Sequence, residues 1–324
     1  MSQLPPGPAG MSHTRIPWQV RFGLLSLIWG SSFLLIKAAL RAWEPLQVGA
    51  GRILFGALAT AALAVATRSR LPRSWRVWGH LQVTAFLLAT APFVLFPLGE
   101  ERVSSALAGI GNATTPLATV LATFALLPQD RLSRAKLGAV AVGFVGVVVI
   151  MAPWEAHERP DLLGFGMTLV AGGCYGVGWT YLRRFLARED LGGLSLPAAQ
   201  LLAAAGQMLL VLGGWWLLHR EQVSWPFGTR QLAGSDVTPA VLALAALGVV
   251  GTGLAYWLQF DVVRAVGQQV ASTVTYVIPV VAVALGVLVL HERLTWPELA
   301  GAAIVVGSAI AIGRPQRPAA PPQS

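Results

Sequence analysis

Long apolar stretches alternate with short polar segments along most of the chain. Most of these stretches reach the roughly 17–25 residues that an α-helix needs to cross a hydrocarbon core about 30 Å thick. The two shortest stretches come fifth and tenth in the order. We therefore predict ten membrane-spanning helices, over Phe22–Leu40, Leu46–Ala66, Val77–Leu98, Ser104–Leu127, Leu137–Met151, Leu162–Leu182, Leu196–Leu218, Val237–Phe260, Val270–Leu290 and Leu299–Ile312.

The composition supports an all-α integral membrane protein. Of the 324 residues, 55% are hydrophobic and only 11% are charged, and the mean hydropathy is +0.64. A soluble domain carries about 25% charged residues, so this chain cannot cover a soluble surface with charge. The ends, residues 1–17 and 314–324, are polar and rich in proline, and we expect both to be disordered cytoplasmic tails.

The distribution of basic residues predicts the orientation in the membrane. With the N-terminus in the cytoplasm, fifteen basic residues fall on the inner side of the predicted spans and six on the outer side. Both termini are therefore expected in the cytoplasm, with the lipid bilayer as the surroundings of the spans. The formal charge of +9 comes from short arginine clusters between apolar runs, without interleaved aromatic residues, which argues against nucleic-acid binding. The one cysteine, Cys174, excludes an internal disulfide and a cysteine-based metal cluster.

The chain also contains an internal repeat. The tripeptide Ile28–Gly30 in the first span matches Cys174–Gly176 in the sixth, and Asn112–Pro116 in the fourth matches Thr275–Pro279 in the ninth. Each half has five predicted spans, an odd number, so the second half must enter the membrane from the opposite side. We therefore predict two inverted five-helix repeats with a substrate site between them near the middle of the membrane; the repeats cover residues 18–152 and 153–313.

Several motifs resemble the EamA family of the drug/metabolite transporter superfamily. They are Trp29-Gly30-Ser31-Ser32 with Lys37, Pro45 followed by Arg52, Thr114-Thr115-Pro116, Asp130-Arg131-Leu132-Ser133, and the stretch from Leu247 to Gly313. The first repeat departs once, because Gln129-Asp130 replaces a glutamate that is usual at the end of the fourth span. The resemblance implies a ten-helix permease that exports or exchanges small metabolites, often amino acids, across a bacterial inner membrane.

Two prolines at matching places suggest a polar cavity. A proline within a helix leaves the carbonyl four residues earlier without its hydrogen bond; for Pro116 that carbonyl belongs to Asn112, and for Pro279 it belongs to Thr275. The alternative is a kink that only shapes helix packing. Because the feature recurs in both halves, we predict that both prolines act as kinks or gates and that their polar neighbours bind substrate, namely Asn112, Thr115, Thr275 and Tyr276.

Two charged residues fall within the predicted spans. Lys37 lies close to the outer end of the first span, where its side chain is expected to reach the interface. Arg52 lies deeper, and it is either a structural anchor or a contact for an anionic substrate group. All 14 acidic residues fall outside the predicted spans. Because no intramembrane carboxylate offers a proton carrier, the sequence predicts facilitated diffusion or exchange without proton coupling.

Aromatic residues within the spans complete the predicted pocket, because small-molecule sites are mostly apolar with a few polar groups. The candidates are Trp29, Tyr175, Trp179, Tyr256 and Gln259. We predict a secondary transporter that moves a small organic metabolite, an amino acid or a related compound, by alternating access as an exporter or exchanger. It is expected to be either a monomer or a homodimer. The alternative is a membrane protein that does not transport, such as an intramembrane enzyme or a scaffold. No catalytic residue, metal ion or cofactor is expected. The sequence His291-Glu292 matches the first half of the zinc-binding motif HExxH, but Thr295 stands where the motif requires its second histidine.

Overall fold

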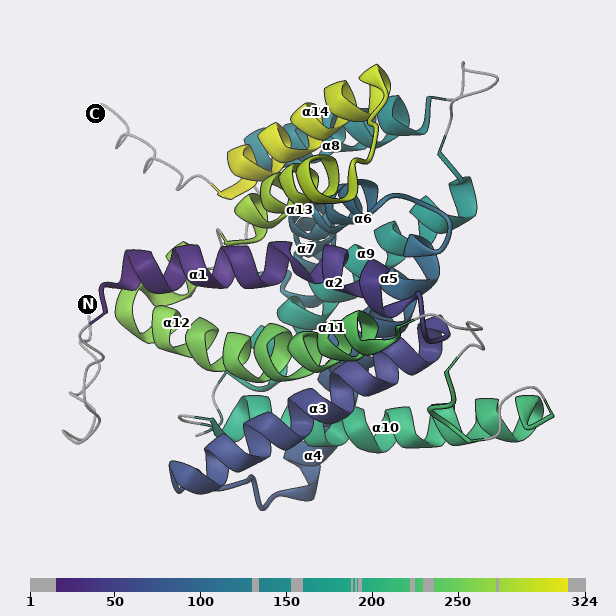
Figure 1. Cartoon of the computed structure of the whole chain (residues 1–324). Helices are drawn as coiled ribbons and strands as arrows, with labels where there is room; N and C mark the ends of the chain where they lie inside the picture. The colour runs from purple at the N-terminus through teal and green to yellow at the C-terminus, as the bar shows by residue number, and fades with distance from the viewer. Residues whose placement is uncertain are drawn as a thin grey trace, which may run out of the picture.

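The computed structural model describes residues 16–129, 134–152, 160–187, 189, 191, 194–221, 225–229, 236–271 and 274–313. In these residues all regular structure is helical (Figure 1). The predicted disordered tails lie almost entirely outside the described residues. The helices are α1 Trp18–Gly30, α2 Ser32–Ala39, α3 Pro45–Ala66, α4 Trp75–Ala85, η1 Phe86–Thr90, α5 Ala91–Glu100, α6 Ser105–Asn112, α7 Thr115–Leu126, α8 Arg134–Met151, α9 Leu162–Phe185, α10 Ser195–His219, α11 Thr238–Gly248, η2 Val249–Leu254, α12 Ala255–Ala271, α13 Val274–Leu290 and α14 Trp296–Gly313.

Seven helical segments in the described part of the chain are long and apolar enough to cross a membrane. Three of them join several helices: Trp18–Ala39 combines α1 and α2, Trp75–Glu100 combines α4, η1 and α5, and Thr238–Gln259 combines α11, η2 and the start of α12. Two shorter apolar segments lie in α13 and α14. The predicted all-helical structure is therefore confirmed for the described residues. That all ten spans cross the membrane as inverted repeats stays a prediction.

The two prolines that the sequence pairs have different local structures. The predicted fourth span is divided into α6 and α7, and the Thr114 hydroxyl in the break donates a 2.7 Å hydrogen bond to the Gly111 carbonyl. Pro116 is thus the second residue of a new helix, where its missing N–H costs little. Pro279 instead lies inside the continuous helix α13. The predicted mirrored kink is a helix break in the first half and a proline within a helix in the second.

Two π-helical turns lie at matching places in the two halves. The turn η1 begins at Phe86 and η2 begins at Val249, which is 163 residues later and the same separation as between Pro116 and Pro279. Such turns contain one extra residue, change the direction of the side chains that follow, and occur frequently at functional sites. In η2 the Thr252 hydroxyl donates to the carbonyl of Leu247, five residues earlier, at 3.0 Å.

Helices from the two halves pack against one another in reciprocal pairs. Helix α3 packs against η2 while α10 packs against η1, and α2 packs against α11 while α9 packs against α5. Helices α3 and α10 contact each other, as do α6 and α13. Helices α8 and α14 form a further pair, at the top of Figure 1. Large apolar side chains on the outside, such as Leu58, Phe124 and Leu210, are exposed, as expected for a surface that lipid covers.

One predicted helix end is wrong at a charged residue. The third span was expected to end at Leu98, because the polar run that begins at Gly99 lowers the local hydropathy. Helix α5 continues through Glu100, whose side chain is fully buried. The expectation that every carboxylate lies outside the spans is therefore wrong for Glu100. The helix extends because α2 and α6 pack against it and supply the polar contacts that this turn needs.

Candidate substrate-binding site

The Arg52 side chain lies among α2, α3, α5 and η2 and is only 7% exposed. Its Nε donates to the Thr252 hydroxyl at 3.2 Å, and its Nη2 lies 3.5 Å from the Ser32 hydroxyl. Its guanidinium carbon lies 4.0 Å from the centre of the Phe93 ring, a cation–π arrangement. Helix α3 comes this close to α5 because it has no side chain at Gly49, where a Cβ atom would collide with the Phe93 carbonyl oxygen.

The guanidinium of Arg52 has no carboxylate partner among the described residues. The ion pairs found there join Arg21 to Asp261 and Arg102 to Asp161. Burying a charge without a counter-charge is costly, and hydroxyl groups and a ring compensate only part of that cost. The surroundings of Arg52 are therefore suited to receiving an anionic group from outside the chain.

Two tyrosines lie near this guanidinium. Tyr175 in α9 and Tyr256 in α12 are both near enough to interact electrostatically with Arg52. Tyr175 packs on Phe96, with ring centres 6.0 Å apart. Tyr256 is 8% exposed and lies beside the Gln200 side chain of α10. The structure thus brings together three residues that the sequence predicts as a site, each from a different helix.

The other predicted residues of this group lie one helical turn from Tyr175 or Tyr256, or contact the η2 turn. The Trp29 indole N–H donates to the Gly251 carbonyl at 3.2 Å, next to Thr252. Trp179 is half-buried, one turn after Tyr175 in α9. Gln259 is 6% exposed, one turn after Tyr256, and among the described residues its Oε1 has no hydrogen-bond partner.

The predicted residues around the two prolines form a second group. Asn112 and Thr115 lie on either side of the break between α6 and α7, and both are buried. Within the described structure, Asn112 Oδ1 and Thr115 Oγ1 have no hydrogen-bond partner. The break packs closely on Gly172 of α9, one turn before Tyr175. Thr275 is half-buried, Pro116 and Pro279 are buried, and the Tyr276 side chain lies outside the described structure.

A match to a protein-family model identifies the class of protein to which this chain belongs. The model of the EamA-like transporter family matches residues 19–152 and, a second time, residues 162–314. The chain belongs to the EamA-like transporter family. It is therefore a multi-pass membrane transporter with a small-molecule substrate, and the resemblance inferred from the motifs is confirmed.

The similarity to other proteins extends over nearly the whole length of this EamA-like transporter. The uncharacterized inner membrane transporter YedA of Escherichia coli strain K12 is 23% identical over 293 residues, which cover 89% of this chain and 88% of YedA. Protein PecM of Dickeya dadantii is 24% identical over 88% of each chain. A "probable amino-acid metabolite efflux pump" of Salmonella typhimurium is 24% identical over 87% of this chain and 90% of that protein. A protein of known crystal structure, 22% identical, shares the fold with a TM-score of 0.58 over 91% of this chain and 95% of that chain.

Sequence reasoning missed several residues in and near the candidate site of this EamA-like transporter. Ser32 and Thr252 stand inside the motifs that carry the family resemblance, and their positions there were the available signal. Phe93 and Gln200 gave no signal, because an aromatic or amide residue in an apolar span has no recognisable spacing. Glu100 was missed because the span was expected to end two residues earlier.

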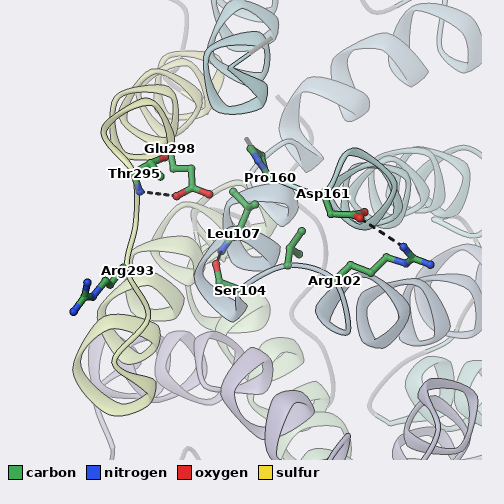
Figure 2. Close-up of a pocket in the computed structure, with 9 residues that line it drawn as sticks. Arg102, Ser104, Leu107, Pro160, Asp161, Arg293, Thr295 and Glu298 are labelled. Atoms are coloured by element: carbon green, nitrogen blue, oxygen red, sulfur yellow. Dashed lines mark hydrogen bonds and ion pairs between the residues drawn. The ribbon is translucent and has the colours of Figure 1, made fainter. Parts of the chain in front are cut away.

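A separate pocket of about 340 Å³ lies at one end of the helix bundle (Figure 2). It is formed where the segments after α5, before α9 and before α14 meet, and the orientation predicted from the sequence places all three on the outer side. Two of its lining residues, Arg102 and Asp161, form an ion pair at 3.5 Å, and Glu298 accepts a hydrogen bond from the Thr295 N–H. The lining residues are Arg102, Val103, Ser104, Leu107, Pro160, Asp161, Arg293, Thr295 and Glu298.

Proposed function

We propose that the protein is a secondary transporter that moves a small carboxylate-bearing metabolite, an amino acid or a related compound, across the bacterial cytoplasmic membrane by alternating access. The observation that carries this proposal is the buried Arg52 guanidinium, for which the described residues provide no carboxylate partner. A substrate carboxylate would supply the missing charge and could accept both guanidinium N–H groups of one edge. The hydroxyls of Ser32 and Thr252 would then bind Arg52 only while the site is empty.

The neighbouring groups suit the remainder of an amino acid. The rings of Tyr175, Tyr256 and Trp29 offer apolar area, and their faces attract an ammonium group. Unpartnered oxygen atoms of Asn112, Thr115 and Gln259 could accept its N–H groups if the helices close around it. The Salmonella relative named as a probable amino-acid metabolite efflux pump supports this substrate class and favours export or exchange as the direction.

The proposed architecture is ten membrane-spanning helices in two inverted repeats, with both termini in the cytoplasm. Its support is the twofold family match, the equal spacing of the two π-helical turns and the reciprocal packing of α3 on η2 and α10 on η1. The ends of the bundle are consistent with it as well. Three predicted outer segments meet at the pocket of Figure 2, while the predicted inner residues Arg21 and Asp261 form an ion pair.

In this arrangement Arg52 links the two halves. It belongs to α3 of the first half, and its Nε contacts Thr252 of the second half. Rocking of one half against the other would expose Arg52 first to one side of the membrane and then to the other. A carboxylate that replaces the Thr252 contact would loosen the connection between α3 and η2 and permit this motion.

Inverted membrane vesicles test the proposal. Vesicles that contain the wild-type protein should accumulate at least one of a panel of labelled amino acids, and Arg52→Gln should lose at least 90% of that uptake. The matched control is Arg73→Gln, because Arg73 is exposed in the segment between α3 and α4. Expression and melting temperature of each variant separate lost transport from lost folding. If a folded Arg52→Gln protein takes up the amino acid as well as the wild type does, the proposed role of Arg52 is refuted.

A further inference from the structure

Glu100 has the surroundings of a proton-binding carboxyl group. It lies at the end of α5 with no exposed surface. One carboxyl oxygen, Oε2, lies 2.9 Å from the Ser105 hydroxyl of α6. The other, Oε1, is buried without a hydrogen-bond partner in the described structure. An ionised carboxylate needs several donors to offset its desolvation, so one contact leaves this group poorly stabilised as an anion.

The charged groups around Glu100 do not neutralise it directly. Lys37 of α2 faces it, but the ammonium nitrogen binds backbone carbonyls, that of Glu100 itself and that of Val103 at 3.1 Å. Glu292, between α13 and α14, also acts on it, and its carboxylate accepts from the backbone N–H groups of Ser105 and Ala106 at 2.8 and 3.0 Å. Arg52 of α3 acts on Glu100 from farther away. A second negative charge so near favours a neutral Glu100.

The hydrogen bonds of Ser105 agree with a protonated carboxyl group. The Ser105 Oγ lies 2.9 Å from Glu100 Oε2 and 3.3 Å from the Phe33 carbonyl. A hydroxyl has one hydrogen to donate, and a carbonyl and a carboxylate are both acceptors. If Glu100 is protonated on Oε2, it donates to Ser105, which in turn donates to Phe33, and both contacts become full hydrogen bonds.

We propose that Glu100 is the proton-binding site of this transporter, occupied in the present conformation, and that transport is coupled to protons through it. This replaces the expectation of uncoupled transport, which depended on the absence of a carboxylate from the spans. The coupling rests on the proposed transport function, whereas proton binding by Glu100 does not. When the proton is released, the O–H bond of the Glu100 carboxyl group breaks and the proton passes to water. The Lys37 ammonium group then turns from the backbone carbonyl of Glu100 to the newly formed carboxylate.

The pocket of Figure 2 supplies the route to water. Val103 and Ser104 line it. The carbonyl of Val103 binds Lys37, and Ser104 immediately precedes the hydroxyl that contacts Glu100. Glu100 therefore contacts Ser105, the residue that directly follows Ser104 in the lining of this opening. In the predicted orientation this opening faces the periplasm, so a small displacement of α6 would connect the carboxyl group to the outer solution.

Infrared difference spectroscopy tests proton binding without any substrate. The full-length protein is reconstituted in liposomes of phosphatidylethanolamine and phosphatidylglycerol, and spectra are recorded across a pH series. The wild type should show the carbonyl stretch of a protonated carboxyl group at neutral pH, and this band should disappear as the pH rises. Glu100→Gln should lack the band. The control Glu101→Gln, which alters the exposed neighbouring residue, should keep it. A wild-type band that is unchanged in Glu100→Gln would overturn the proposal.

A second variant keeps the carboxyl group and changes its neighbour. Lys37→Met removes the cation that would stabilise ionised Glu100, so the band should persist to higher pH than in the wild type. An unchanged titration would contradict the proposed exchange between Lys37 and Glu100. The coupling is then measured with the amino acid that the vesicle panel identifies: its transport rate should depend on pH in the wild type and not in Glu100→Gln. If the panel identifies none, the infrared result still decides proton binding, and the transport function alone fails.

Discussion

The Arg52 guanidinium of α3 donates a 3.2 Å hydrogen bond to the Thr252 hydroxyl of η2. These residues belong to different halves of the chain and meet at a π-helical turn. The same hydroxyl donates its own hydrogen to the Leu247 carbonyl at 3.0 Å, which leaves its lone pairs for Arg52. The extra residue of the turn is therefore what places an acceptor beside the buried cation.

Thr252→Val should weaken transport by about tenfold or more. Valine has nearly the same shape but accepts no hydrogen bond, so the Arg52 Nε loses its partner, and an unsatisfied buried donor costs about 1–3 kcal/mol. Uptake into vesicles and the melting temperature measure the two effects. Thr123→Val is the matched control, because the Thr123 hydroxyl only donates to a carbonyl of its own helix at 2.8 Å. Equal transport by the two variants would show that the Thr252 contact has no part in the cycle.

Asn112→Ala should reduce transport much more than stability. The buried Oδ1 of Asn112 has no partner in the described structure, so its removal breaks no hydrogen bond through that atom. Thr275→Ala should act in the same direction, as the sequence repeat predicts. Transport assays alongside thermal unfolding of each variant provide the comparison. If both variants transport normally, the polar residues beside Pro116 and Pro279 serve helix packing and the cavity does not include them.

Substrate and proton should bind with positive cooperativity. Arg52 and Glu100 interact electrostatically, and a substrate carboxylate at Arg52 would offset the positive charge of the guanidinium. Anion binding should therefore promote proton uptake, and by reciprocity a lower pH should tighten substrate binding. Glu100→Gln, which resembles the protonated state, should bind the substrate equally well at all pH values. If the affinity of the wild type for its substrate does not change with pH, substrate binding and proton binding are not linked.

Reporter fusions test the inverted architecture. A reporter joined after Gly192 or after Gly313 should report the cytoplasm, and one joined after Arg102 should report the periplasm. The first two positions follow the sixth and tenth predicted spans, and the third follows the third span. A periplasmic signal from Gly192 or Gly313 would break the ten-span model, whatever the state of the substrate site.

The sequence predicts the helices and the residues at the centre of the candidate site because both predictions depend on local signals. Apolar runs mark the spans, and Arg52, Tyr175 and Tyr256 are conspicuous as polar or aromatic residues within them. Pairings across the fold have no such signal. Nothing in the sequence near Arg52 indicates Thr252, 200 residues away, since a π-helical turn has no recognised composition.

Helix ends and helix breaks were the least predictable features. The repeat predicts that Pro116 and Pro279 are equivalent. The helix is nevertheless interrupted just before Pro116, whereas helix α13 continues through Pro279. Hydropathy ends the third span at Leu98, whereas packing against α2 and α6 extends it to Glu100. Tertiary contacts decide such ends, and the error concealed the one fully buried carboxyl group described in the structure.

The most direct test of the central claim compares an amino acid that is transported with its carboxamide. The two molecules differ in the charge that Arg52 is proposed to bind, while their size and side chain are the same. Wild-type protein should prefer the amino acid by at least tenfold in the ratio of transport rate to half-saturating concentration, and Arg52→Gln should lose this preference. A preference that is equally strong in Arg52→Gln would contradict the assignment of Arg52 as the carboxylate-binding residue.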